Sequence, residues 1–186
     1  MRYIQRAMAA SALVLATGLT GCSGPTASTA GTAGGGDGHT VTNKSASDVL
    51  KQFTGSVQDT LSTVGGSWSY RDNSAWKATQ ASDFTAHDCG NLQKTWQYSV
   101  TLSGPGDPDP GKAIQKVSDH WKSLGYDVGA AGGWAATPSA LVPEQRDISS
   151  VTKDGVKLTY QAGTLSSTFS GESACSTSPT MVATGS

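Results

Sequence analysis

The sequence predicts an α+β fold: a two-layer sandwich of a mainly antiparallel sheet with two helices on one face and a C-terminal β-meander. Three observations predict it. Apolar residues recur every three or four positions over 45–64 and 110–124. Apolar and polar residues alternate strictly over 95–102, and an Asp-Gly pair at 154–155 separates two extended runs.

The first helix is expected over 45–64. Ser45 followed by Asp48 approximates a capping box at its start, and the glycine pair 65–66 ends it. Gly55 inside the helix costs about 1 kcal/mol relative to alanine. The apolar residues of one face are Val49, Leu50, Phe53, Val57, Leu61 and Val64.

The second helix is expected to follow Asp109-Pro110, with aspartate as the N-cap and proline at the first helical position, and to end at Gly125. Asp107 and Asp109 form its entry turn, because alternating prolines and the lack of further oxygen ligands argue against a calcium loop. The expected buried face consists of Ile114, Val117, Trp121 and Leu124.

The strands follow from alternation. The even positions of 95–102 are apolar, which predicts a strand with one buried face. Another strand is expected to start at 126–128. Asp154-Gly155 predicts a hairpin with a type I′ turn, and the runs on both sides of it, together with 165–170, predict the meander. Residues 66–94 and 134–143 show no pattern long enough for an assignment.

The N-terminal residues predict export. Arg2 and Arg6 precede an apolar stretch, 7–19, which is too short to span a bilayer as a permanent helix. Leu19-Thr20-Gly21-Cys22 then resembles the bacterial lipobox, in which the cysteine receives a diacylglyceryl group and becomes the new N-terminus. This resemblance implies a lipoprotein with Cys22 as the lipidated residue, held on the extracytoplasmic face of the cell membrane.

The expected domain organisation has four parts. Residues 1–21 are the signal peptide, and 22–44 are the lipidated cysteine with a disordered tether rich in Gly, Thr and Ser, spanning about 25 Å. Residues 45–176 form a single domain, and 177–186 form a flexible tail.

Two cysteines remain after Cys22. In an exported chain, Cys89 and Cys175 are most simply a disulfide. A metal ligand or a catalytic thiol is the alternative, but the sequence has no Cys-x-x-Cys and His87-Asp88-Cys89 stands alone.

Catalytic signals are weak. The sequence lacks Gly-x-Ser-x-Gly, Ser-x-x-Lys and His-Glu-x-x-His motifs, so we expect no catalytic residues, metal site or cofactor, and we place a hydrolase last. His87 with Asp88 lacks a third partner, and His120 borders the apolar helix face. The net charge of −1, without runs of like charge, argues against nucleic acid as a partner.

Aromatic residues offer the other candidate site. Four of them lie outside the clearest core patterns and are either packed in the fold or form a stacking platform for a sugar ring or an apolar ligand. They are Trp68, Tyr70, Trp76 and Trp134.

Several features taken together resemble small lipoproteins of actinobacterial cell envelopes, such as the LppA-like group. They are the lipobox, the spacer, the cysteine pair, the Leu124-Gly125-Tyr126 helix stop and the end at 171–175. The resemblance implies location and fold more than activity. We therefore expect a monomeric, non-enzymatic binding or interaction domain that contacts an envelope protein or glycan. The alternative is a carrier or sensor of a small apolar or glycan ligand, bound in a pocket between helices and sheet.

Overall fold

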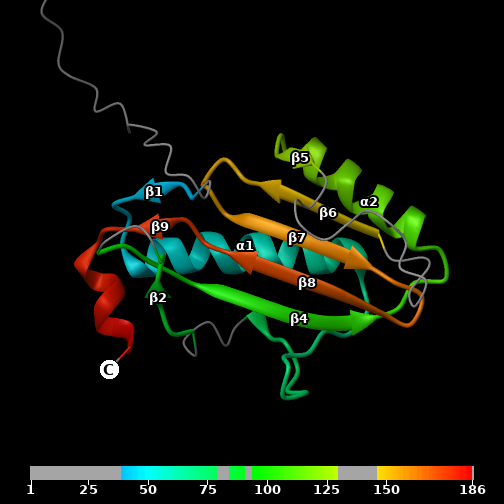
Figure 1. Cartoon of the computed structure of the whole chain (residues 1–186), viewed down its shortest axis with the longest axis horizontal. Helices are drawn as coiled ribbons and strands as arrows, with labels where there is room; N and C mark the ends of the chain where they lie inside the picture. The colour runs from blue at the N-terminus through cyan, green and yellow to red at the C-terminus, as the bar shows by residue number, and fades with distance from the viewer. Residues whose placement is uncertain (1–38, 79–83, 91–93, 130–145, 186) are drawn as a thin grey trace, which may run out of the picture.

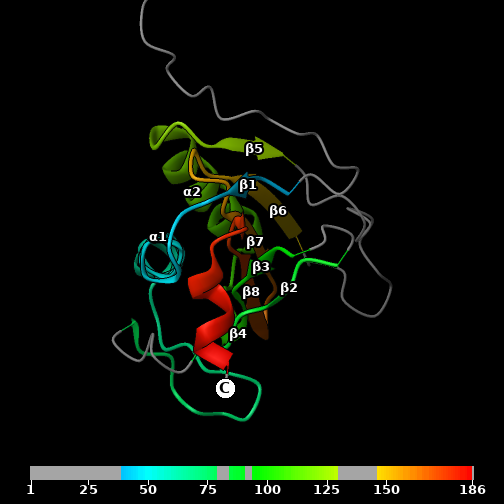
Figure 2. The ribbon, with the colours of Figure 1, turned by 90° about the vertical axis from the view of Figure 1, so that its left-hand side faces the viewer.

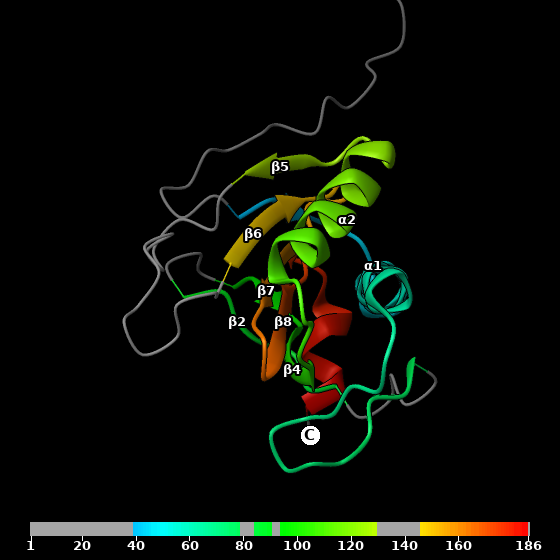
Figure 3. The same cartoon turned by 90° about the vertical axis from the view of Figure 1, so that its right-hand side faces the viewer.

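The computed structural model describes residues 39–78, 84–90, 94–129 and 146–185 (Figure 1). These residues form two α-helices on one face of an antiparallel sheet, with a second, smaller sheet at one end (Figures 2 and 3). The predicted α+β class and its two layers are confirmed.

Helix α1 (Ala46–Val64) has the predicted ends. The Ser45 hydroxyl accepts a hydrogen bond from the backbone N–H of Asp48 at 3.3 Å, and Gly65, with φ of +87°, ends the helix. Positive φ suits glycine because it has no Cβ. The residues it buries in the core include Val49, Phe53, Val57 and Leu61.

Helix α2 (Pro110–Ser123) also begins as predicted, because the Asp109 carboxylate accepts from the backbone N–H of Lys112 at 3.1 Å. Val117 and Trp121 are fully buried on its inner face. The prediction for Leu124 is wrong: its side chain is 36% exposed. Helix α2 ends at Ser123, one residue before Leu124, so the side chain of Leu124 does not continue the apolar face of the helix.

The large sheet is antiparallel throughout, and the three of its strands that come last in the sequence form the predicted meander. Its strand order is β4-β8-β7-β6-β5. The strands are β4 (Ser99–Pro105), β5 (Asp127–Gly129), β6 (Arg146–Val151), β7 (Lys157–Ala162) and β8 (Ser166–Glu172).

The hairpin between β6 and β7 is present, but its predicted turn type is wrong. Thr152 and Val156 close a loop in which Gly155 has φ of +80° and Asp154 does not adopt a positive φ. A type I′ turn requires positive φ at both central residues, whereas a three-residue loop with glycine in the left-handed position does not. The Asp-Gly signal therefore located the hairpin but not its geometry.

The stretch predicted as one strand over 95–102 is divided. Strand β3 (Trp96–Gln97) belongs to the small sheet, and β4 begins at Ser99. Alternation continues along β4, where Val100 and Leu102 are buried, but Gln97 is buried and Trp96 is only half-buried. The change of sheet at Tyr98 interrupts the period.

Both expected domain boundaries differ from the structure. Strand β1 (Val41–Thr42), which we assigned to the tether, pairs in parallel with β9 (Cys175–Ser176). The expected flexible tail contains a 3-10 helix, Pro179–Gly185, whose Met181 is fully buried in the core. The folded unit therefore begins before residue 45 and continues past 176, because long-range pairing and burial order both ends.

The small sheet contains the cysteine pair. Its order is β1-β9-β3-β2, with β2 at His87–Asp88, and Cys175 on β9 is bonded to Cys89, which directly follows β2. The two Cα atoms are 6.2 Å apart, and the bridge closes 86 residues of sequence. The bridge thus links the end of the chain to its middle.

Tyr160 carries a buried hydroxyl on β7. Neither this hydroxyl nor that of Ser167 has a hydrogen-bond partner in the described part of the chain. Burial raises the pKa of the Tyr160 hydroxyl, and the Ser167 side chain lowers it by less. The phenol is therefore held protonated without the benefit of a hydrogen bond.

We expect Tyr160→Phe to raise the free energy of unfolding at neutral pH by about 1 kcal/mol, because it removes an unpartnered buried group. A tyrosine whose pKa is raised on folding makes its full contribution to stability below the unfolded-state pKa of 10.0. That contribution is lost as the pH rises through the folded-state pKa. The variant should therefore lose less stability in alkaline solution. Urea unfolding at neutral and alkaline pH measures both effects, and a less stable variant at neutral pH would contradict the assignment.

Candidate functional site

Three of the four aromatic residues singled out in the sequence, Trp68, Tyr70 and Trp76, are described by the structure, and these three do not form one exposed platform. Trp68 is a core residue: it is 5% exposed, its ring lies 6.4 Å from that of Tyr160, and its Nε1 donates to the Gly65 carbonyl at 3.0 Å. Trp134 lies outside the described residues. Of the two alternatives for Trp68, packing in the fold is therefore confirmed, and the stacking role is wrong because the surface of the ring is used in packing.

Tyr70 and Trp76 do lie together. Their ring centroids are 5.8 Å apart, and Trp76 also contacts Phe84 at 6.0 Å. Trp76 Nε1 donates to the Gln58 side chain at 3.0 Å. Tyr70 and Phe84 border a hollow of about 670 Å³ beside the start of β4. Trp76 serves here as a packing link between α1 and the following loop.

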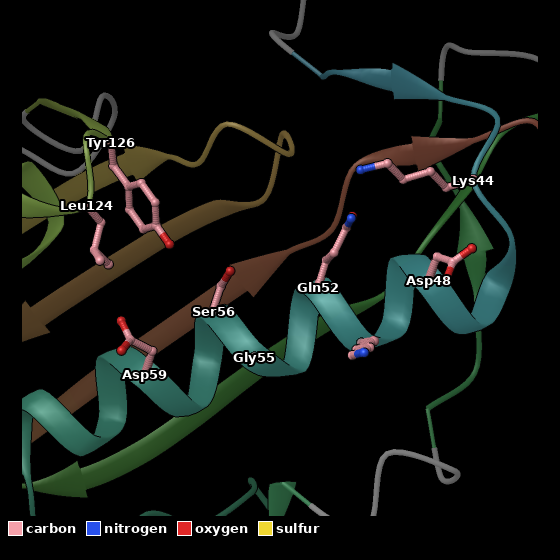
Figure 4. A pocket seen from close by; sticks show the side chains of 9 residues that line it. Lys44, Asp48, Gln52, Gly55, Ser56, Asp59, Leu124 and Tyr126 are labelled. Atoms are coloured by element: carbon pink, nitrogen blue, oxygen red, sulfur yellow. The ribbon is translucent and has the colours of Figure 1, made fainter.

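A second hollow lies beside α1 and is the candidate site. This α1 groove has a volume of about 650 Å³ and lies between α1, the residue before its N-cap, and the turn from α2 to β5 (Figure 4). Its lining residues are Lys44, Asp48, Lys51, Gln52, Gly55, Ser56, Asp59, Leu124 and Tyr126.

The floor of the α1 groove is one row of helix residues. Gln52, Ser56 and Asp59 are spaced four and three residues apart, which places them on one face of the helix. Gly55 lies between their turns, and a Cβ added there would meet no atom within 4 Å. The glycine is therefore required neither by a close neighbour nor by its backbone conformation.

One end of the groove is built by the α2–β5 turn. Leu124 and Tyr126 extend from this turn toward α1 (Figure 4). Burial raises the pKa of the Tyr126 hydroxyl; hydrogen bonding with Ser56 lowers it, and the negative charges of Asp59 and Asp154 add to the rise. The hydroxyl remains a donor at neutral pH. The side chains of Leu124 and Tyr126 therefore form an apolar wall at this end, and the Tyr126 hydroxyl is its polar group.

Two short contacts between titratable side chains border the groove. His120 Nε2 on α2 lies 2.6 Å from Asp59 Oδ2 on α1. At the other end, Lys44 Nζ lies 2.7 Å from Asp154 Oδ1 in the β6–β7 loop. Both pairs connect segments that are distant in sequence, so they help to fix the width of the groove.

Sequence reasoning missed this groove. Helical periodicity places Leu124 on the buried face, and the pattern that follows places Tyr126 at the start of a strand, so neither residue predicts a surface site. The available signal was Gly55, an unfavourable residue in the middle of an otherwise regular helix. His120, expected at the edge of the core, is half-buried there and pairs with Asp59 across the two helices.

The remaining predicted sites have different outcomes. Cys22 and the leader lie outside the described residues, whereas the Cys89–Cys175 disulfide is present in the structure. Among the described residues, no helix is long and apolar enough to cross a membrane. Within the same ranges, no three His, Cys, Asp or Glu side chains are placed to hold a metal ion.

Comparisons with known proteins identify a likeness of fold. No protein-family model and no curated protein that was searched matches the sequence. Among solved structures, the crystal structure of a DUF4853 family protein from Actinomyces odontolyticus is similar, with a TM-score of 0.51 and 12% sequence identity. The match covers 74% of this chain and 71% of the other. At this identity, the chain is similar to that protein in its α+β fold alone.

Proposed function

We propose that this protein is a lipid-anchored, extracytoplasmic binding domain of a cell envelope, and that the α1 groove is its binding site. The anchor is supported by Leu19-Thr20-Gly21-Cys22 directly after a short apolar leader. The bridge between Cys89 and Cys175 is consistent with an oxidising compartment outside the cytoplasm.

The observation that carries the binding site is Gly55. Glycine in a helix interior is less favourable than alanine by about 0.5 to 1 kcal/mol. Where a natural sequence breaks a local rule of this kind, a functional or strained site is expected. Because no neighbouring atom and no positive φ demands glycine here, an open groove floor is the requirement that remains.

Replacing Cys22 with alanine is expected to release the protein from membranes, because the variant has no thiol to receive a lipid. Fractionation of cells into membrane and soluble parts measures this, with Ser23→Ala as the matched control that keeps the anchor. A Cys22→Ala variant that still sediments with membranes would show that the lipobox interpretation is wrong.

Replacing Gly55 with alanine is expected to stabilise the domain by about 0.5 to 1 kcal/mol, because the methyl group meets no atom and the helix gains propensity. Urea unfolding measures the change. Gly65→Ala is the matched control: it also meets nothing within 4 Å, but its φ of +87° strains a side chain, so it should destabilise. Destabilisation by Gly55→Ala would mean that the fold itself needs this glycine.

Site-specific photocrosslinking in living cells tests the binding site. A benzophenone amino acid is placed at Gln52 in the groove or, as a control, at Gln115 on the exposed side of α2. We expect illumination to give a discrete adduct from position 52 and none from position 115. No adduct at 52, or the same adduct at both positions, would contradict the groove as the binding site.

A further inference from the structure

We propose that the α1 groove binds a neutral, polyhydroxylated ligand, namely a sugar unit of an envelope glycan. This inference rests on the groove being the binding site proposed above. It adds the chemical class of the ligand, which is argued from the charges, the free hydrogen-bonding groups and the apolar wall of the groove.

Three of the charged side chains that line the groove already contact other groups of the protein. Asp59 is 2.6 Å from His120, and Lys44 is 2.7 Å from Asp154. The Asp48 carboxylate accepts a hydrogen bond from the Ser45 hydroxyl at 2.6 Å. The lining contains two lysines, Lys44 and Lys51, and two aspartates, Asp48 and Asp59, so its formal charges cancel. A ligand with a net charge of either sign would therefore meet a like charge in the lining, whereas a neutral ligand would not and would leave both side-chain contacts intact.

Hydrogen-bonding capacity remains along the floor. Gln52 has no side-chain hydrogen bond within the described residues, so its amide offers two donors and an acceptor. A carboxylate has more acceptor sites than one histidine uses, so Asp59 can accept further bonds. Both side chains lie on one helix face, but they are about 10.5 Å apart along the helix axis, so they suit hydroxyls of two linked sugar units.

The wall at the far end is apolar. Leu124 is 36% exposed, and the ring of Tyr126 stands beside it (Figure 4). An aromatic ring with a polar tip packs against apolar C–H surface while its hydroxyl still forms a hydrogen bond. A sugar presents both kinds of surface, so it matches the wall and the floor at the same time.

An acyl chain or another wholly apolar ligand matches the groove less well. It would cover the polar floor without replacing the hydrogen bonds of Gln52 and Asp59 to water, which is costly. An extended peptide finds no strand edge here, because the floor is a helix whose backbone groups are bonded internally. The volume of about 650 Å³ lies within the range of roughly 300–1,000 Å³ that is usual for small-ligand sites.

The test is an NMR titration of the full lipidated chain in detergent micelles, with N-acetylchitotriose, cellotriose and maltotriose as neutral probes and citrate as the anionic probe. We expect at least one trisaccharide to shift the Tyr126 and Gln52 signals, and citrate to leave them unchanged. Gln52→Ala should weaken binding about three- to tenfold, and the matched Gln115→Ala should leave it unchanged.

Gly55→Leu fills the groove with a residue that favours helix, so it should abolish trisaccharide binding while the variant remains folded. Failure of all three trisaccharides, preferential binding of citrate, or unchanged binding by Gly55→Leu would each overturn the sugar assignment. If the Gln52 crosslink still forms in cells, the proposed binding site stands without its sugar. If that crosslink is also absent, the binding site itself fails.

Discussion

The Cys89→Ala/Cys175→Ala double variant is expected to lose roughly 4 to 5 kcal/mol of folding free energy. The bridge closes 86 residues of sequence, and a loop of that length restricts the unfolded chain by about this amount in the chain-entropy model. Cys175 is fully buried, and its strand β9 joins β1 to β3. Alanine is preferred to serine because it leaves no unpartnered hydroxyl in this environment.

Urea unfolding of the double variant measures the loss, and the wild type treated with a reductant provides an independent comparison. Alkylation of denatured, unreduced wild type should label neither Cys89 nor Cys175. A double variant with an unchanged unfolding midpoint would contradict a stabilising bridge.

Trp121→Ala is expected to cost about 3 to 5 kcal/mol, the range for removing a large, fully buried aromatic side chain. Trp121 is 0% exposed on α2, and its Nε1 donates to Thr60 Oγ1 on α1 at 3.0 Å. The same Thr60 hydroxyl donates to the Ser56 carbonyl at 3.0 Å. The variant thus loses packing between the helices and leaves Thr60 without its indole partner.

Denaturant unfolding measures this cost. Lys122→Ala is the matched control, because it changes the next residue on the exposed side of α2 and should alter stability by less than about 0.5 kcal/mol. Thr60→Val should give an intermediate loss, since it leaves the indole N–H unpartnered but preserves volume. A loss below about 1 kcal/mol for Trp121→Ala would contradict its role in joining the helices.

The parts of the fold that could be predicted are those with local causes. The caps of both helices lie within three residues of the groups that they bond, so Ser45 and Asp109 located the helix starts. The meander followed from alternation on both sides of Gly155. In each case the sequence signal and the physical cause lie in one short stretch of chain.

The parts that could not be predicted depend on distant partners. Val41 and Thr42 form a strand only because β9 offers a parallel partner at the far end of the chain, and nothing local marks them. The α1 groove has the same origin, since Leu124 and Tyr126 border it only after α2 has packed against α1. Periodicity describes a helix face but not what lies opposite it.

The pairing of β1 with β9 has a mechanical consequence. The described chain enters the fold through β1. Here the backbone N–H of Cys175 donates to the Thr40 carbonyl, and the backbone N–H of Thr177 donates to the Thr42 carbonyl, each at 2.9 Å. A pull on the segment before β1 loads these two bonds side by side, and β9 is itself cross-linked to Cys89. Because these bonds lie ahead of α1 along the chain, tension on the segment before β1 is borne first by the pairing of β1 with β9.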